Sequence, residues 1–179
     1  MRMPSASKLS RFIACPASFA LPQVEQEVSD SATRGTEIHS YLANQVDSSQ
    51  GVLPLSAETQ EYVAKLSVDE VLAGREVVAA EITILYNPHT RQATVAAGED
   101  KSYRTSHEVI GGTADLILRE PDGRFTILDW KTGYDVEHPK QNKQLLFFAE
   151  CLRRMYGSET QCAGEIAFAA PATGKITVA

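Results

Sequence analysis

Two aspartates and a lysine are spaced so that a β-hairpin would bring them together. Asp115 and Asp129 lie fourteen residues apart, with a Pro-Asp-Gly turn at residues 121–123 midway between them. Apolar runs flank that turn, a pattern typical of a hairpin with a short loop. Folding about the turn places Asp115 opposite Asp129, with Cβ atoms about 4.5–5.5 Å apart. Lys131 lies two residues beyond Asp129 and so points to the same face.

Two carboxylates and an ammonium group at one end of a hairpin indicate a divalent-metal site. Carboxylates this close repel each other, and one takes up a proton unless a cation joins them. Mg²⁺ suits the pair because it prefers oxygen ligands and keeps several waters. Such an ion favours phosphate chemistry, in which Lys131 orients or deprotonates a water or stabilises charge on the phosphate. The alternative is a surface hairpin in which Asp129 and Lys131 pair for solubility.

Length and composition fit one globular domain spanning residues 1–179. The chain has 179 residues, of which 43% are hydrophobic and 22% charged, values typical of a protein with one sizeable core. No apolar run approaches the roughly 20 residues that span a bilayer, and the first residues carry no apolar stretch of a secretory signal. We therefore expect a cytoplasmic protein without a membrane partner.

The net charge of -6 argues against a protein that coats nucleic acid. It does not exclude a nuclease, because catalytic carboxylates add acid and a local basic face is sufficient. Basic residues that would form such a face, or else lie on solvated helix surfaces, are Lys8, Arg11, Lys140, Lys143, Arg153 and Arg154.

Hydrophobic periodicity predicts helices and strands in one layered domain. Helices are expected over residues 5–14, 33–46, 56–73 and 139–156; strands over 77–86, 93–97, 165–170 and 175–178; and the hairpin over 109–131. Both faces of the hairpin carry apolar side chains, so helices must cover both sides of the sheet. The sequence therefore predicts an α/β or α+β fold with a central sheet flanked by helices on both faces.

Five short motifs, in order along the chain, resemble the PD-(D/E)XK nuclease superfamily, and within it the RecB-like branch. They are Ser7-Lys8-Leu9 with Cys15-Pro16, Gly35-Thr36-Glu37-Ile38-His39, Gly112-Thr113-Ala114-Asp115, Asp129-Trp130-Lys131-Thr132-Gly133, and Gln144 with Phe148. The resemblance is strongest to phage-borne nuclease domains of that superfamily and more distant to CRISPR-adaptation nucleases. It implies a mixed sheet with a restriction-endonuclease-like core.

The resemblance also implies a ligand set for one or two Mg²⁺ or Mn²⁺ ions. His39, Asp115 and Asp129 would bind metal, together with the backbone carbonyl of Trp130, whose side chain we expect in the core. A nitrogen ligand shifts the preference toward Mn²⁺. The alternative for His39 is a packed or capping histidine, and Gly35, one turn earlier, would leave room for metal or phosphate.

Three further polar residues are candidates for the site. Gln144 lies on the apolar face of its helix and needs a partner; the resemblance implies that it contacts the substrate backbone or Lys131. Gln141 is a weaker candidate of the same kind. Glu81 resembles a glutamate that precedes the metal motifs in this branch, although a solvent-facing position on its strand fits nearly as well. Phe148 we expect in the core.

The cysteines argue against an iron–sulfur cluster. Some RecB-like nucleases tie a cysteine at the position of Cys15 to three others near the C-terminus, but this chain has only Cys15, Cys151 and Cys162, and a cluster needs four thiolates. We expect no cluster and a buried, structural Cys15.

The resulting hypothesis is a metal-dependent deoxyribonuclease of phage or bacterial DNA recombination or processing. Its partner is DNA, single- or double-stranded, and a recombination protein or further copies of the chain are compatible partners. Exonuclease and endonuclease action both remain open. The alternative is a nuclease fold that binds DNA or a protein without cutting, and a hydrolase of another phosphorylated substrate is a further rival.

Overall fold

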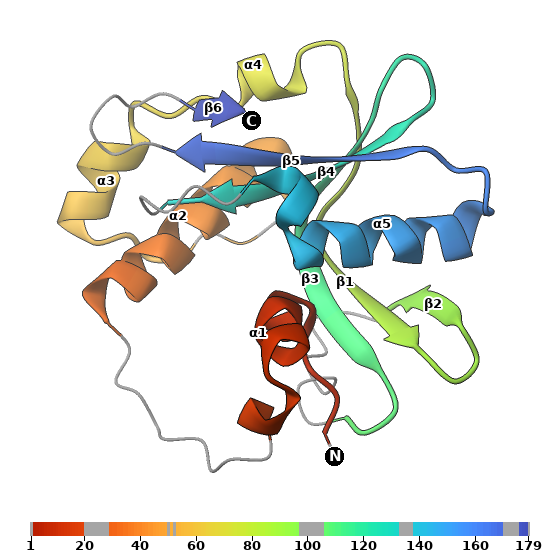
Figure 1. Ribbon diagram of the computed structural model, residues 1–179. Helices are drawn as coiled ribbons and strands as arrows, with labels where there is room; N and C mark the ends of the chain where they lie inside the picture. The colour runs from red at the N-terminus through yellow and green to blue at the C-terminus, as the bar shows by residue number, and fades with distance from the viewer. Residues whose placement is uncertain are drawn as a thin grey trace.

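A six-stranded mixed sheet is the centre of the computed structural model (Figure 1). The structure describes residues 2–19, 29–49, 51, 53–96, 106–132, 138–169 and 176–178. The strand order is β2-β1-β3-β4-β5-β6, and only β4 and β5 pair in parallel. The strands are β1 (Glu76–Asn87), β2 (Gln92–Val95), β3 (Ile110–Arg119), β4 (Phe125–Lys131), β5 (Cys162–Ala169) and β6 (Ile176–Val178).

The hairpin of β3 and β4 forms as the sequence predicts. Leu116 pairs with Leu128, and the same register, continued by one residue, sets Asp115 opposite Asp129. The turn closes with Gly123 at φ +85°, a conformation that glycine adopts without steric cost. Its N–H donates to the carbonyl of Glu120 at 2.9 Å.

Helices cover both faces of the sheet (Figure 1). On one face α5 (Lys143–Tyr156) packs its buried residues against Ile117 and Ile127. On the other face α2 (Asp30–Val46) packs Ile38 and Leu42 in a cluster with Leu116 and Leu128. The expected fold class, an α+β mixed sheet with a helical layer on each face, is thus confirmed.

The long helix expected from Ser56 to residue 73 is wrong: the chain forms α3 (Ala57–Val63) and α4 (Asp69–Leu72) instead. Ser56 is the N-cap of α3, and its Oγ accepts a hydrogen bond from the N–H of Thr59. The break follows from Ser67 and Asp69. The Ser67 hydroxyl donates to the Asp69 carboxylate at 2.7 Å and accepts from the Asp69 N–H at 3.2 Å. Such local side-chain bonds compete with helical ones.

The expected N-terminal helix is split into η1 (Ala6–Lys8) and α1 (Leu9–Ala14), followed by η2 (Pro16–Phe19). The apolar spacing of Leu9, Phe12 and Ile13 predicts that all three face inward, but Ile13 is 61% exposed. Cys15 is exposed rather than buried. The reason is Pro16, which biases the preceding residue away from helical geometry; Cys15 has φ -152° and ψ 87° and lies at the point where the chain leaves α1.

The helix expected from Pro139 begins with a 3₁₀ turn, η4 (Pro139–Gln141), before α5. The pattern also predicts a polar excursion through Gly98-Glu99-Asp100-Lys101, which lies outside the described residues. Among the described helices, none has the length and apolar composition needed to cross a bilayer.

Candidate metal centre

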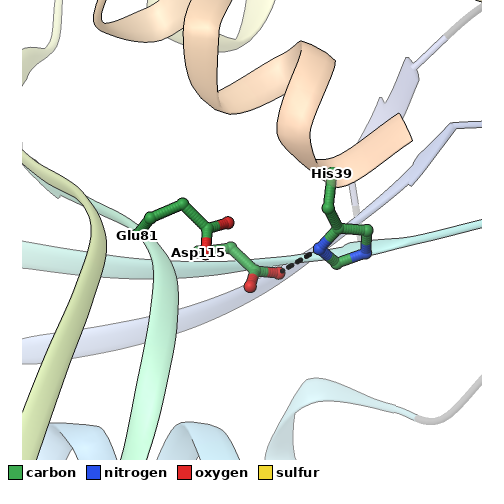
Figure 2. A group of neighbouring side chains, drawn as sticks. All are labelled: His39, Glu81 and Asp115. Atoms are coloured by element: carbon green, nitrogen blue, oxygen red, sulfur yellow. Dashed lines mark ion pairs between the residues drawn. The ribbon is translucent and has the colours of Figure 1, made fainter. Parts of the chain in front are cut away.

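Three side chains from three elements converge beside the sheet. His39 comes from α2, Glu81 from β1 and Asp115 from β3, and Figure 2 shows them pointing toward one another. One ligand atom of each lies within 4.8 Å of those of the other two. Nδ1 of His39 is 3.5 Å from Oδ2 of Asp115. An imidazole nitrogen and two carboxylates form a donor set suited to Mg²⁺ or Mn²⁺.

An interruption in strand β1 turns Glu81 toward this group. Side chains normally alternate between the faces of a strand. However, Ala80 packs on the α2 side, whereas Ile82 packs on the α5 side. Glu81, between them, has φ +49°, which is uncommon for a residue with a side chain and is sustained only by the surrounding structure. The flanking pairs of β1 with β3 set Glu81 opposite Asp115.

Strand β3 changes face at the same level. Ala114 and Ile117 both pack on the α5 side, although strict alternation would separate them. Asp115 lies between them, buried, and its Oδ2 accepts a hydrogen bond from the backbone N–H of Trp130 at 2.7 Å. The Trp130 side chain is 1% exposed in the α2-side cluster, as expected for a core residue.

Asp129 and Lys131 form a pair next to the triad. Nζ of Lys131 lies 2.5 Å from Oδ2 of Asp129, and the Asp129 side chain is 6% exposed against 36% for Lys131. Asp129 is not a member of the three-residue group of close ligand atoms. His39 and Asp115 thus lie close to Glu81, whereas Asp129 forms an ion pair with Lys131.

Burial and neighbouring charges shift the pKa values of two groups in the centre. Burial and the charge of Asp115 raise the pKa of Asp129 above its usual range, although Lys131 and His39 oppose the shift. Burial by itself would lower the pKa of His39, but its hydrogen bond to Asp115 and the nearby carboxylates raise it overall. A divalent cation would relieve the repulsion that keeps a proton on these groups, so the residues present fit such an ion.

Gln144 and Gln141 differ in their relation to the centre. Gln144 lines a cleft of about 540 Å³ that also includes Glu81, Gly112 and Thr113. The N-cap of α5 fixes its position: Oδ1 of Asn142 accepts from the Gln144 N–H at 2.9 Å. Gln141, by contrast, is exposed in η4 and is not among the described residues of this cleft.

Two other expectations concern the packing around the centre. Phe148 lies in the core, 1% exposed, as expected. A Cβ on Gly35 would lie 3.2 Å from Oγ1 of Thr132, so this glycine allows close approach of the residue after Lys131; its expected role in leaving room for metal or phosphate stays a prediction.

The N-terminal wall of the cleft was not predicted from the sequence. Residues 2–8 supply Arg2, Ser5, Ser7 and Lys8 to it. The sequence singles out Ser7 and Lys8 as part of the first motif, and Lys8 also as part of a basic face, but not as residues of a cleft. Nothing in the sequence pattern places this segment beside β3.

Comparison with protein-family models identifies the family of this chain. The family model of the PD-(D/E)XK nuclease superfamily matches residues 4–176, a range that includes the centre, the Asp129–Lys131 pair and the cleft lining other than Arg2 and Met3. Comparison with curated proteins found no match.

Proposed function

The chain belongs to the PD-(D/E)XK nuclease superfamily, and from this we propose that it is a metal-dependent deoxyribonuclease that hydrolyses phosphodiester bonds. One observation carries the proposal. The ligand atoms of His39, Glu81 and Asp115 lie within 4.8 Å of one another, beside a carboxylate that is paired with Lys131.

In this proposal His39, Glu81 and Asp115 hold one or two Mg²⁺ or Mn²⁺ ions, with Asp129 and the backbone carbonyl of Trp130 as further ligands. When bound, such an ion polarises a phosphoryl oxygen and acidifies a water. The Trp130 N–H holds one oxygen of Asp115 in place, so this carboxylate is oriented in advance and little reorganisation is needed.

Lys131 acts on the water and on the phosphate. Its ammonium group is anchored 2.5 Å from the Asp129 carboxylate, while the side chain keeps about a third of its surface exposed toward solvent. It therefore orients the attacking water and stabilises negative charge that grows on the phosphate. Gln144 contacts the substrate backbone from the cleft side.

The biological setting we propose is DNA recombination or processing by a phage or bacterium, in the cytoplasm, as a single nuclease domain over residues 1–179. The motif at Cys15-Pro16 and the one at Gln144 support the RecB-like branch. Assembly with further copies or with a recombination protein is compatible with this role. No iron–sulfur cluster is part of the proposal.

The test is a cleavage assay on circular and linear DNA, each single- and double-stranded, with Mg²⁺, Mn²⁺ or EDTA. We expect cleavage that requires metal. Lys131→Ala should lower its rate by roughly 10²–10³, the usual effect of losing one transition-state charge partner, while Mn²⁺ affinity measured by calorimetry stays close to that of the wild type.

Asp129→Ala removes the carboxylate that pairs with Lys131 and is tested beside Lys131→Ala. The control is Lys65→Ala, at an exposed lysine after α3. Cleavage by Asp129→Ala with unchanged metal dependence would contradict the mechanism. DNA binding without cleavage of any substrate would favour the alternative, a nuclease fold that binds without cutting. The circular and linear substrates separate endonuclease from exonuclease action.

A further inference from the structure

The cleft beside the metal centre has a wall that no part of the proposed mechanism uses. One side is formed by residues 2–8 and Phe19, and the other by β1, β3 and Gln144 of α5. Glu81 belongs both to this lining and to the metal triad. The cleft therefore adjoins the candidate metal centre at Glu81.

The N-terminal segment is built into the fold at this place. The N–H of Met3 donates to the carbonyl of Ser106 at 2.9 Å, and Ala6 is buried. Ala6 occupies the space that Gly112 leaves on β3: a Cβ on Gly112 would lie 2.5 Å from the Cβ of Ala6. The segment thus forms a fixed wall with a defined distance to β3.

The wall is basic although the chain as a whole is acidic, with a net charge of -6. Arg2 and Lys8 line the cleft together with the hydroxyl groups of Ser5 and Ser7. Within the described part of the chain, Glu81 is the only acid of the lining, and neither cation forms a salt bridge. Guanidinium, ammonium and hydroxyl groups together are the donors that contact phosphate in protein–nucleic acid complexes.

Phe19 adds an aromatic surface to the basic wall. Its ring meets that of Phe12 edge-on, with centroids 5.4 Å apart and an interplanar angle of 84°, so α1 and η2 hold it in place. A positive groove with an aromatic side chain is the arrangement by which proteins bind single strands without reading their sequence.

We propose that this cleft binds one unpaired nucleic-acid strand and leads it to the metal centre, with Arg2 and Lys8 contacting its phosphates and Phe19 stacking on a base. The inference rests on the proposed function and adds the class of substrate. The size of the cleft supports a single strand rather than a duplex. Its volume of about 540 Å³ is that of a small-ligand site. A duplex is too wide for a cavity of this volume, since its major groove alone is about 12 Å wide.

The experiment measures binding of a short fluorescent oligothymidylate by anisotropy, in EDTA and again in Ca²⁺. Arg2→Ala/Lys8→Ala should weaken binding at least about tenfold. The slope of the logarithm of the binding constant against the logarithm of the salt concentration should also become shallower by about 1.4, because each lost phosphate contact on a single strand removes about 0.7. Arg2→Lys/Lys8→Arg keeps both charges and should bind within about threefold of the wild type, and Lys65→Ala should be unchanged.

Competition identifies the ligand. Unlabelled oligothymidylate should displace the probe far better than a blunt duplex hairpin, a mononucleotide or polyglutamate. Equal competition by the duplex would overturn the assignment to a single strand, and equal competition by polyglutamate would show that the cleft recognises charge alone. Wild-type protein that fails to bind the strand would also overturn the inference.

Cleavage is measured separately, so that the two proposals can fail independently. If the wild type cuts DNA and Arg2→Ala/Lys8→Ala binds and cuts equally well, the inference fails while the proposed function stands. If the wild type binds the strand through Arg2 and Lys8 but cuts nothing, the inference stands and the proposed function fails.

Discussion

At the scale of single residues, the Asp115 carboxylate joins the parts of the centre. Its Oδ2 accepts from the Trp130 N–H at 2.7 Å and lies 3.5 Å from Nδ1 of His39. Across the sheet it faces Glu81, whose backbone has φ +49°. A backbone conformation that costs free energy and aims a carboxylate at two other ligand atoms is the kind of strain that persists at functional sites.

Glu81 yields a prediction that is separate from catalysis. Glu81→Gln keeps the shape of the side chain and removes one negative charge from the triad. Affinity for Mn²⁺, measured by calorimetry, should fall about 10–100-fold, the loss that even outer partners of metal ligands cause. Glu76→Gln, on the same strand and exposed, is the control. Unchanged affinity in Glu81→Gln would remove this residue from the ligand set.

The cysteines permit a prediction about reactivity. Burial, with a smaller contribution from the charge of Glu150, raises the pKa of the Cys151 thiol to about 12, whereas Cys15 is exposed. Because the thiolate is the reactive form, iodoacetamide near pH 8 should label Cys15 and leave Cys151 intact until the protein is unfolded. Mass spectrometry of tryptic peptides reads the two sites separately. Early labelling of Cys151 would mean that α5 opens in the native state.

The sequence contained the information for some of these residues and not for others. Asp115 and Asp129 could be paired in advance, because a turn midway between them sets the register. The position of Glu81 in the triad could not be derived from the sequence. Strand side chains are expected to alternate strictly between the two faces, and the positive φ of Glu81 interrupts this alternation. The expectation of a buried Cys15 is wrong, because the apolar pattern that precedes it does not continue into the core: Ile13 is already exposed.

At the scale of elements, the contact between η1 and β3 fixes the distance across the cleft. Gly112→Ala tests it. Its added Cβ would lie 2.5 Å from the Cβ of Ala6 and 3.2 Å from the Phe148 ring. Overpacking of this kind costs about 1–3 kcal/mol, so the free energy of unfolding in urea should fall by that amount.

Gly51→Ala is the matched control for this variant. Apart from its chain neighbours, no atom of the described residues lies within 4 Å of the position of its Cβ, so the free energy of unfolding should be unchanged within about 0.5 kcal/mol. Equal stability of Gly112→Ala and Gly51→Ala would mean that the N-terminal segment does not pack against β3 in solution.

The elements themselves show where pattern reasoning succeeds. The pattern predicts Tyr62, Leu66, Val68 and Leu72 as the apolar side of the long helix. Leu66 and Val68 are buried, whereas Tyr62 and Leu72 are only partly buried and their neighbours Val63 and Val71 are buried instead. The chain nevertheless breaks between α3 and α4, because Ser67 and Asp69 bond to each other. Hydrophobic periodicity identifies part of the buried face, but local polar bonds decide whether the helix continues along it.

At the scale of the whole molecule, the centre lies where the two hydrophobic clusters meet the sheet. His39 is carried by the helix of one face, and Gln144 by the helix of the other. Glu81 and Asp115 belong to the sheet between them. Because each helix packs against its own cluster, the positions of these candidate site residues depend on both cores rather than on a single loop.

This arrangement predicts that the whole fold is more stable with a cation than without one. The native protein holds several carboxylates close together, and the unfolded chain does not, so an ion binds the native state preferentially. At a concentration 100 times its dissociation constant it stabilises the fold by about 2.7 kcal/mol, which corresponds to a rise in Tm of roughly 5–11 °C for a chain of this length. Calorimetric melts with Mn²⁺ and with EDTA measure the shift, and Asp115→Asn should abolish most of it. An equal shift in Asp115→Asn would place the stabilising ion elsewhere on this acidic protein, even if the fold and the hairpin are as described.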